Sequence, residues 1–198
     1  PQVRLRSVVV RGNQRTRRSV IEREVQLTVG EPISPEAMAR TRSRLYELDL
    51  FGVVEPQLIG DDDRSRDLLL RVEEKRNITL ETGGGVSTDQ GVQLTGRAAH
   101  RNLGGLGQRI EALGSIGYGW FGDEWRIATA EPVWGAALRY EAPYVPARGQ
   151  RLIVEGLIHE TVQQPTYRLD RSGGRVGIRA GRSGIDEIWI DYAVQVRQ

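Results

Sequence analysis

Cysteine is absent from the 198 residues, so neither a disulfide framework nor a thiolate metal site can form. The two histidines, His100 and His159, are too few for a histidine-rich metal site. His159-Glu160 begins like the zinc motif H-E-x-x-H, but Gln163 stands where that motif needs its second histidine. We therefore expect no metal site and no cofactor.

An excess of charge of one sign is also missing. The sequence has 28 Lys and Arg against 26 Asp and Glu, and Lys75 is its single lysine. A nucleic-acid-binding protein is expected to cluster an excess of basic charge, so this balance does not favour that class. The basic run at Arg15, Arg17 and Arg18 is followed by acidic residues, which is typical of the solvated start of a helix.

Long apolar runs are missing too, since none approaches the roughly 20 residues that a transmembrane helix requires. Membrane β-strands remain possible, because they carry only short segments of alternating polarity. The sequence has no signal-peptide pattern and starts at Pro1 with strand-like residues, so we expect a piece of a longer chain. Glycine is frequent, 24 of 198, and concentrated after residue 82, as in a barrel with many turns.

Catalytic motifs are not convincing in this sequence. Gly117, Gly119 and Gly122 match G-x-G-x-x-G, but bulky aromatic residues fill the spaces and no helix is expected to follow. The pair Glu73-Glu74 indicates a solvated strand end rather than an acid/base pair. We found no nucleophile elbow and no P-loop, and therefore expect no catalytic residues and no enzyme.

The first 75 residues predict an α+β domain with the order β-α-α-β-β. Val3 to Val10 is rich in β-branched residues, although Leu5 differs in parity from Val8 and Val10, so a bulge or burial on both faces is needed. Thr16 is the expected N-cap of a helix from Arg17 to about Leu27.

The second helix has a stronger start signal. Ser34 suits the N-cap, Pro35 suits the first helical position, and Glu36 suits the positive end of the helix dipole. The apolar face predicted for this helix consists of Ala37, Thr41, Leu45 and Leu48.

Two further strands complete the predicted domain. Asp67 to Glu74 is expected to turn Leu68, Leu70 and Val72 inward, after a polar tip at Asp61–Arg64. Val53 to Ile59 contains Pro56, which favours an edge position. The residues of this strand that we expect to offer an edge to peptides are Val53, Val54, Gln57, Leu58 and Ile59.

From Ile78 onward the sequence alternates with period two through seven strand candidates. One face of these strands is apolar, and in a membrane barrel we expect it to face lipid at Val92, Leu94, Ile110, Ile116, Leu138, Tyr140, Val154, Ile158, Val176, Ile178, Ile190, Tyr192 and Val194. The opposite face is charged, at Arg97, Arg109, Glu111, Arg139, Glu155, His159, Arg175, Arg179 and Asp191.

Alternation alone does not separate a membrane barrel from a soluble sheet with a buried apolar face. The connections favour the barrel, because short turns on one side alternate with longer loops on the other. The expected short turns are Asn102–Gly107, Pro143–Gly149 and Gly181–Gly184. They alternate with connections near Thr88–Gln90, Gly119–Pro132 and Thr161–Arg171, of which the last two are longer. Aromatic residues that suit an interfacial girdle gather around one loop, at Trp120, Phe121, Trp125 and Trp134.

Three consecutive glycines, Gly83 to Gly85, lie in the first of these strands and weaken it, because each costs backbone entropy and offers no side chain to pack. Two interpretations stay open. The glycines ease the opening of a barrel at this strand, or they make room for a neighbouring side chain or bend the strand.

Both halves of the sequence resemble one known family. Residues 8–74 resemble a POTRA domain, through VVVRGNQRT, a Val-Ile-Glu-Arg-Glu helix, Gly-Glu-Pro before a capped helix, LYELDLFGVVEPQL and LLLRVEE. Residues 76–198 resemble the first half of the barrel of the BamA/TamA outer-membrane assembly-factor family, through GGGVSTDQG, HRNLGGLGQ and LRYEAPYV.

This resemblance implies a POTRA domain at residues 1–75, in the periplasm, followed at 76–198 by part of an antiparallel, meandering barrel of about sixteen strands in the outer membrane. In such a protein the POTRA domain receives unfolded outer-membrane proteins and the first strand templates their insertion into outer-membrane lipid, with periplasmic accessory proteins as further partners. The resemblance assigns strand pairing with the substrate to Ile78, Leu80, Thr82, Gly83, Gly84, Gly85 and Val86.

Two alternatives remain at this point. A two-partner-secretion or TamA-type translocator would have the same organisation in this part of the chain. A soluble ligand-binding β-domain would show the same alternation, with its apolar face inward and its charges in solvent.

Overall fold

The computed structural model describes residues 3–60, 62, 64–87, 91–118, 132–147, 149–164, 167–180 and 186–197. Contacts divide the chain into two compact units, each of which is described by itself. Unit 1 is Pro1–Asn77 with Arg101–Gly107, and unit 2 is Ile78–His100 with Gln108–Gln198. The expected domains 1–75 and 76–198 stay a prediction. Among the described residues, no helix is both long and apolar enough to cross a membrane.

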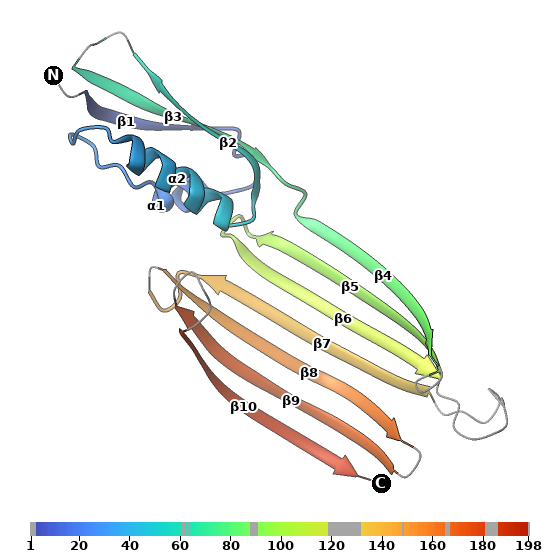
Figure 1. Cartoon of the computed structure of the whole chain (residues 1–198). Coiled ribbons are helices and arrows are strands. Elements are labelled where there is room, and N and C mark those ends of the chain that lie inside the picture. The colour runs from blue at the N-terminus through green and yellow to red at the C-terminus, as the bar shows by residue number, and fades with distance from the viewer. Residues whose placement is uncertain are drawn as a thin grey trace. The chain divides into compact units, whose positions relative to one another are not determined.

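Unit 1 is a three-stranded sheet with two helices. In the strand order β1-β3-β2, β1 (Arg4–Arg11) runs parallel to β3 (Ser65–Glu74), and β2 (Phe51–Ile59) runs antiparallel to it. The helices α1 (Arg18–Glu24) and α2 (Pro35–Glu47) cover one face of the sheet (Figure 1). The predicted order β-α-α-β-β is confirmed.

The parity problem in β1 is solved by a bulge. The register with β3 shifts between Leu5 and Ser7, so Leu5 turns into the core while Val8 and Val10 also pack against it. The residues of β3 that were predicted to turn inward, Leu68, Leu70 and Val72, are part of the same core. The buried apolar core is Leu5, Val20, Ile21, Leu45, Leu50, Phe51, Val54, Leu68, Leu70 and Val72.

Helix α2 begins as predicted. The Ser34 hydroxyl accepts a hydrogen bond from the backbone N–H of Ala37 at 3.3 Å, and Pro35 occupies the first helical position. Ala37, Thr41 and Leu45 are buried, so the predicted face of the helix is confirmed.

Two expectations for α1 are wrong. The N-cap position is Arg17, without a side-chain cap, and the Thr16 hydroxyl instead accepts a hydrogen bond from the Asn102 amide at 2.9 Å. The helix ends at Glu24 rather than Leu27, because the chain turns so that the Gln26 N–H donates to the Thr41 hydroxyl at 2.9 Å. Neither partner is close in sequence, so neither was visible in the local pattern.

Glu74 corrects a further expectation, since it is not a solvated strand end. Its carboxylate accepts hydrogen bonds from the backbone N–H groups of Arg15, at 3.0 and 3.1 Å, and Thr16, at 2.7 Å. Charge-assisted bonds of this kind are stronger than neutral ones, so Glu74 holds the turn between β1 and α1 in place.

The segment Arg101–Gly107 is part of unit 1, although its first three residues are the end of β5 (Gly91–Leu103), a strand of the large sheet. Asn102 is 3% exposed, and besides its bond to Thr16 it accepts a hydrogen bond from the Gly107 N–H at 2.9 Å. The backbone N–H of Arg17 donates to the Gly105 carbonyl at 2.9 Å. The sequence indicated only a short turn here.

At the other end of the small sheet, Asp62 caps the chain before β3 by accepting from the Arg64 N–H and the Ser65 hydroxyl, at 2.9 and 2.7 Å. Asp61 and Asp63, which were expected in this tip, lie outside the described residues. In β3, hydrogen bonds from the Arg6 guanidinium and the Ser7 hydroxyl lower the pKa of Asp67 to about 2.

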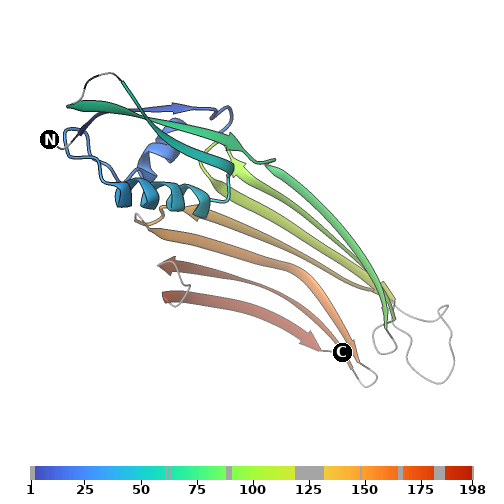
Figure 2. The ribbon, with the colours of Figure 1, turned by 45° about the horizontal axis from the view of Figure 1, so that its top comes forward.

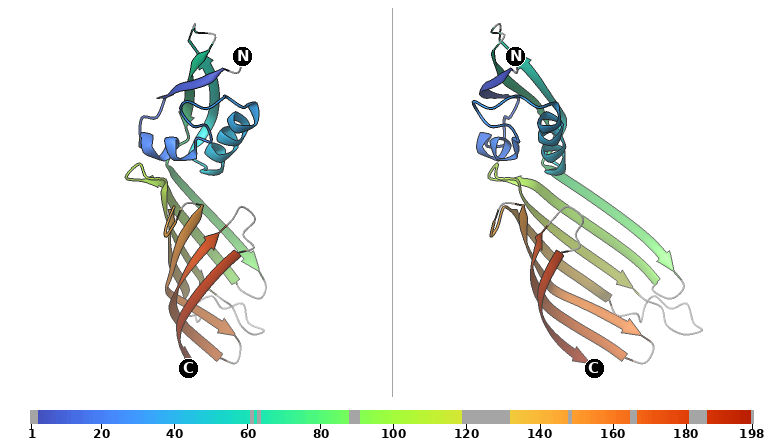
Figure 3. Two further views of the ribbon diagram at one scale, coloured as in Figure 1. Left: turned by 90° about the vertical axis from the view of Figure 1, so that its left-hand side faces the viewer. Right: turned by 60° about the vertical axis from the view of Figure 1, so that its left-hand side comes forward.

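Unit 2 is an open antiparallel sheet of seven described strands, in which each strand neighbours the next along the chain (Figure 3). Figure 2 shows the same strands from another side, curving along their length. The seven predicted strands are confirmed, with β4 and β10 at the edges. Their bounds are β4 Ile78–Ser87, β5 Gly91–Leu103, β6 Gln108–Tyr118, β7 Pro132–Pro143, β8 Gln150–Gln164, β9 Tyr167–Ala180 and β10 Asp186–Arg197.

The long connection expected at Thr161–Arg171 is wrong. β8 continues to Gln164 and β9 starts at Tyr167, with Thr161 opposite Asp170 in the ladder. Polar residues interrupted the apolar alternation there, but backbone pairing continues regardless of side-chain polarity. The following expected features lie outside the described residues: the connections at 88–90, 119–131 and 181–184, and Trp120, Phe121 and Trp125.

We predict that Gly12→Ala destabilises unit 1. Gly12 has φ +93°, and an added Cβ would lie 2.0 Å from the Val72 carbonyl oxygen in the middle of the sheet. The free energy of unfolding of this unit should fall by about 2–4 kcal/mol, as measured by urea-dependent hydrogen exchange of β3 amides in the full-length protein.

The matched control is Gly30→Ala, because Gly30 has φ +89° but nothing within 4 Å of an added Cβ. It should cost only the backbone strain of about 1–2 kcal/mol. Equal losses for both variants would contradict the steric explanation.

Candidate functional site

The two faces of the large sheet differ in chemistry as predicted. Large apolar side chains on one face are 36–75% exposed. Of the residues expected to face lipid, Tyr140 and Ile178 are half-buried and the others are exposed. A contiguous apolar surface of this kind indicates contact with another molecule or with a membrane.

His159 departs from the alternation. The register of β8 with β7 and β9 shifts near Leu157, which places His159 opposite Ala136, a residue of the apolar face. Its ring stacks on Trp134 with centroids 3.8 Å apart. The expectation that His159 lies on the charged face is therefore wrong, and the cause is a bulge that side-chain alternation did not reveal.

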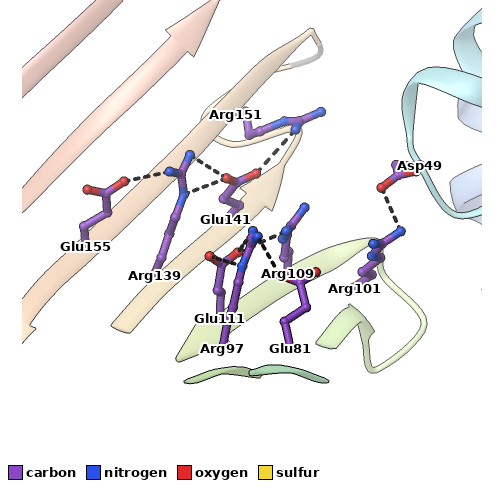
Figure 4. A network of polar contacts seen from close by, with 10 residues as sticks. All are labelled: Asp49, Glu81, Arg97, Arg101, Arg109, Glu111, Arg139, Glu141, Arg151 and Glu155. Carbon is purple, nitrogen blue, oxygen red and sulfur yellow. Dashed lines mark hydrogen bonds and ion pairs between the residues drawn. The ribbon is translucent and has the colours of Figure 1, made fainter. Parts of the chain in front are cut away.

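The opposite face carries a network of ion pairs (Figure 4). The Glu111 carboxylate has a side chain only 8% exposed and is bound by two guanidinium groups, from Arg97 at 2.8 Å and Arg109 at 3.0 Å. Further along, Arg139 bridges Glu141 at 2.7 Å and Glu155 at 3.0 Å. The Arg97–Glu111 and Arg139–Glu155 contacts join neighbouring strands through their side chains, in addition to the backbone ladder, while the other two lie within one strand.

In unit 1 a smaller ion-pair group is centred on Asp49, which contacts Lys75 at 2.6 Å. It also contacts Arg101 at 3.0 Å (Figure 4). Asp49 has a positive φ of 56°. The group ties the end of α2 to the residue that follows β3 and to the segment Arg101–Gly107.

Strand β4 is the first candidate pairing edge. Among the described strands it neighbours β5 alone, and its apolar side chains are strongly exposed, with Ile78 68%, Leu80 75% and Val86 72% exposed. An edge strand presents a row of unpaired N–H and C=O groups, which is a template for another strand.

The three glycines of β4 have different surroundings. An added Cβ would lie 3.0 Å from the Thr95 hydroxyl at Gly83 and 3.1 Å from a Leu94 methyl at Gly84, but nothing lies within 4 Å at Gly85. Room for a neighbouring side chain therefore explains at most two of the three glycines. At Gly85, where crowding gives no reason for glycine, the other interpretation applies, in which glycine weakens the pairing of this strand.

Strand β2 is the second candidate pairing edge, and its edge position, predicted from Pro56, is confirmed. Two successive backbone positions on the side of β2 that faces away from β3 cannot donate a hydrogen bond to an added strand. The backbone N–H of Val54 donates to the Tyr46 hydroxyl at 3.1 Å, and Pro56 has no N–H. Val54 and Leu58 turn into the core, while Gln57 and Ile59 are exposed.

The other edge of the small sheet is also covered in part. The Leu5 N–H donates to the Glu31 carbonyl and the Gly30 N–H donates to the Leu5 carbonyl, at 2.9 and 2.8 Å. Natural proteins blunt sheet edges in this way to limit unwanted pairing. The small sheet therefore offers much less open edge than β4.

Catalytic or metal chemistry has little basis among the described residues, where no three His, Asp or Glu side chains gather as a metal site. His159, Thr161 and Asp170 do form a polar cluster. However, Asp170 approaches the same imidazole nitrogen, Nε2, that contacts the Thr161 hydroxyl, at 3.6 and 2.8 Å. In a catalytic triad the carboxylate holds the other nitrogen, so the geometry does not match.

Comparisons with known proteins agree with this architecture. The family model for POTRA, described as surface antigen variable number repeat, matches residues 3–75. Curated relatives include outer membrane protein assembly factor BamA from Nitratidesulfovibrio vulgaris and from Neorickettsia risticii. Each is 31% identical over 107 residues, which are 54% of this chain and 14% of the relative. The matched part is thus a small share of the relatives' length.

Among solved structures, BamA from Haemophilus ducreyi lacking POTRA domains 1–3 matches with a TM-score of 0.74 and 18% identity, over 99% of this chain and 36% of that chain. CdiB from Escherichia coli matches with a TM-score of 0.55 and 14% identity, over 99% and 37%. At these identities the structures show the fold, which is a POTRA domain followed by barrel strands.

The family-model match at residues 3–75, the curated relatives and the shared fold all point in the same direction. The chain is similar to proteins of the BamA/TamA type, in the part that holds a POTRA domain and barrel strands.

We predict that Tyr46→Phe exposes the Val54 amide. Without the phenol hydroxyl the Val54 N–H loses its partner, a change of about 1 kcal/mol. Its hydrogen-exchange protection in the full-length protein should fall roughly fivefold. Tyr192→Phe, on the apolar face of β10, is the control and should leave Val54 unchanged. Unaltered protection of Val54 in Tyr46→Phe would show that this edge is not capped by the hydroxyl.

Proposed function

We propose that this chain is part of an outer-membrane β-barrel assembly and insertion factor, in which β4 is the edge that templates arriving strands. The observation that carries the proposal is a meandering antiparallel sheet with one exposed apolar face, whose first strand, β4, contains three consecutive glycines. The sheet would lie in the bacterial outer membrane and residues 1–75 in the periplasm.

The physical reason is the cost of unpaired backbone groups in lipid. A bilayer offers no water to hydrogen-bond N–H and C=O groups, so a strand that enters alone is strongly disfavoured. An edge that is already positioned in the membrane supplies those partners. β4 would supply them through its backbone at the residues that the family resemblance assigns to substrate pairing.

The glycines of β4 support this role. A barrel that closes through a weak strand opens at lower cost than one that closes through a well-packed strand. Gly85, whose surroundings leave space for a side chain, is the position where weakness rather than crowding accounts for glycine.

The POTRA domain would receive unfolded outer-membrane proteins before they reach the barrel, with periplasmic accessory proteins as further partners. Strand addition along β2 would be confined to the Gln57–Ile59 end, because Tyr46 and Pro56 limit the donors before it. This is a narrower receptor than the whole strand Val53–Ile59.

A translocator is the second candidate function, and the fold match to CdiB favours it. The same open edge and apolar face would then belong to a secretion channel or a TamA-type protein. A soluble ligand-binding domain is less compatible with these observations, since its apolar face would be buried, whereas here Leu94 and Ile190 are 58% and 75% exposed.

We predict that neighbouring residues on β5 and on β10 differ in lipid contact. The chain lacks cysteine, so a single introduced cysteine can be labelled with a fluorophore. In the full-length protein in vesicles, labels at Leu94 and Ile190 should be quenched by a lipid-borne quencher, and labels at Thr95 and Asp191 should not. Each pair is one residue apart, so the comparison tests the face and not the depth.

Quenching at none of the four sites would mean that the apolar face is covered by protein, and the membrane assignment would fail. Quenching at all four would mean that alternation does not separate lipid from lumen.

We also predict that Gly85→Val reduces insertion activity. Valine favours strands by roughly 1 kcal/mol over glycine, and an added Cβ at Gly85 meets nothing within 4 Å, so the edge should close more firmly. The measurement is the folding of an outer-membrane protein into vesicles that contain the full-length variant. Gly156→Val, on β8, is the matched control, since an added Cβ there also meets nothing within 4 Å.

Gly85→Val should slow insertion several-fold, while Gly156→Val should insert at the wild-type rate. Equal rates for both variants would remove the argument that glycine in β4 serves opening.

A further inference from the structure

One row of residues on the charged face crosses the whole sheet of unit 2, and five of its six steps join directly opposed residues. The register pairs Glu81 with Arg97, Glu111 with Arg139 and Arg139 with Glu155. It continues from Glu155 to Arg175 and from there to Asp191. Between β5 and β6 the row is joined by the Arg97–Glu111 ion pair. We call this row the charge ladder: Glu81, Arg97, Glu111, Arg139, Glu155, Arg175 and Asp191.

The charge ladder alternates in sign at every strand from β4 to β10. Four of its steps are ion pairs: Arg97 with Glu81 at 3.4 Å and with Glu111 at 2.8 Å, Arg139 with Glu155 at 3.0 Å, and Arg175 with Glu155. Opposite charges that face each other across strands stabilise the pairing, and like charges destabilise it. The alternation therefore favours one register across the sheet.

Within the seven described strands, the charge ladder ends in a carboxylate on each outermost strand, Glu81 on β4 and Asp191 on β10. At β4 the neighbouring cation is committed elsewhere, because Arg97 binds Glu111 through two nitrogens at 2.8 and 3.0 Å but Glu81 only at 3.4 Å. The Glu81 side chain is 55% exposed. It therefore has room and charge for a second cationic partner.

We infer that β4 selects strands that carry an arginine or lysine opposite Glu81, so that an arriving strand adds the next rung of the charge ladder. This rests on the proposed function, since it names the partner of the same edge. The partner is a β-strand with apolar residues on the face of Leu80 and a cation on the face of Glu81.

The same contact would set the register of the arriving strand. A slip by one residue would turn its cation to the apolar face, and a slip by two would place it opposite Thr79 or Gly83, neither of which carries a charge. Glu81 thus favours one register of the arriving strand, on a strand whose glycines offer little side-chain packing.

The test uses the full-length protein with Gly85→Cys, a position with space for a side chain on the face of Glu81. The probes are synthetic strand peptides with alternating apolar residues, one cysteine, and arginine, glutamine or glutamate four residues away. In one set the variable residue precedes the cysteine and in the other it follows, to cover both strand directions. An added thiol oxidant, the same for every peptide, accepts the two electrons, and the yield of mixed disulfide is measured in vesicles.

With Glu81 present, the arginine peptide of one set should crosslink about two- to fivefold more than the glutamine peptide, and the glutamate peptide should crosslink least. Glu81→Lys should invert this order. Glu160→Gln, which changes a glutamate of β8 away from both edges, should leave the order unchanged.

The outcomes separate this inference from the proposed function. If all peptides crosslink equally, both in the protein that retains Glu81 and in Glu81→Lys, charge selection is overturned and strand pairing at β4 stands. Crosslinking of none would overturn the pairing edge itself, and this inference with it.

Discussion

Register across the strands is the constraint on which the large sheet depends. Because side chains alternate with period two, a shift of one residue in any pairing would move charges to the apolar face and apolar side chains to the charged face. The ion pairs between Arg97 and Glu111 and between Arg139 and Glu155 lie on the same register that keeps Leu94 and Val154 on the opposite face. Chemistry on each face thus supports the same backbone pairing.

The two sheets treat their edges in opposite ways. In the small sheet, Tyr46 bonds the Val54 amide, Pro56 has no amide hydrogen, and residues 30 and 31 bond Leu5 at the other edge. In the large sheet, the apolar side chains of β4 are exposed, and its three glycines contribute no side chain to packing. Among the described residues, both edges of the small sheet are thus capped in part, and β4 is left to pair with a further strand.

Contacts between distant parts of the sequence account for the expectations that failed. Threonine is a residue type that often caps helices, but the Thr16 hydroxyl accepts a hydrogen bond from Asn102, 86 residues away. Glu74 looked solvated at the end of a strand, but it binds two amides of a turn 58 and 59 residues earlier. The alternation of β8 predicts that His159 lies on the charged face, but a bulge turns its side chain toward Trp134. Local patterns carry no information on such partners.

The sequence by itself determined the order of elements in unit 1, the start of α2 at Ser34, and the seven strands with their apolar and charged faces, because capping and side-chain periodicity are local properties. Only the tertiary structure decided which charges oppose one another, which edges are capped, and that Arg101–Gly107 belongs with unit 1. These depend on pairing register and on contacts between residues far apart in the chain, which are set when the whole sheet assembles.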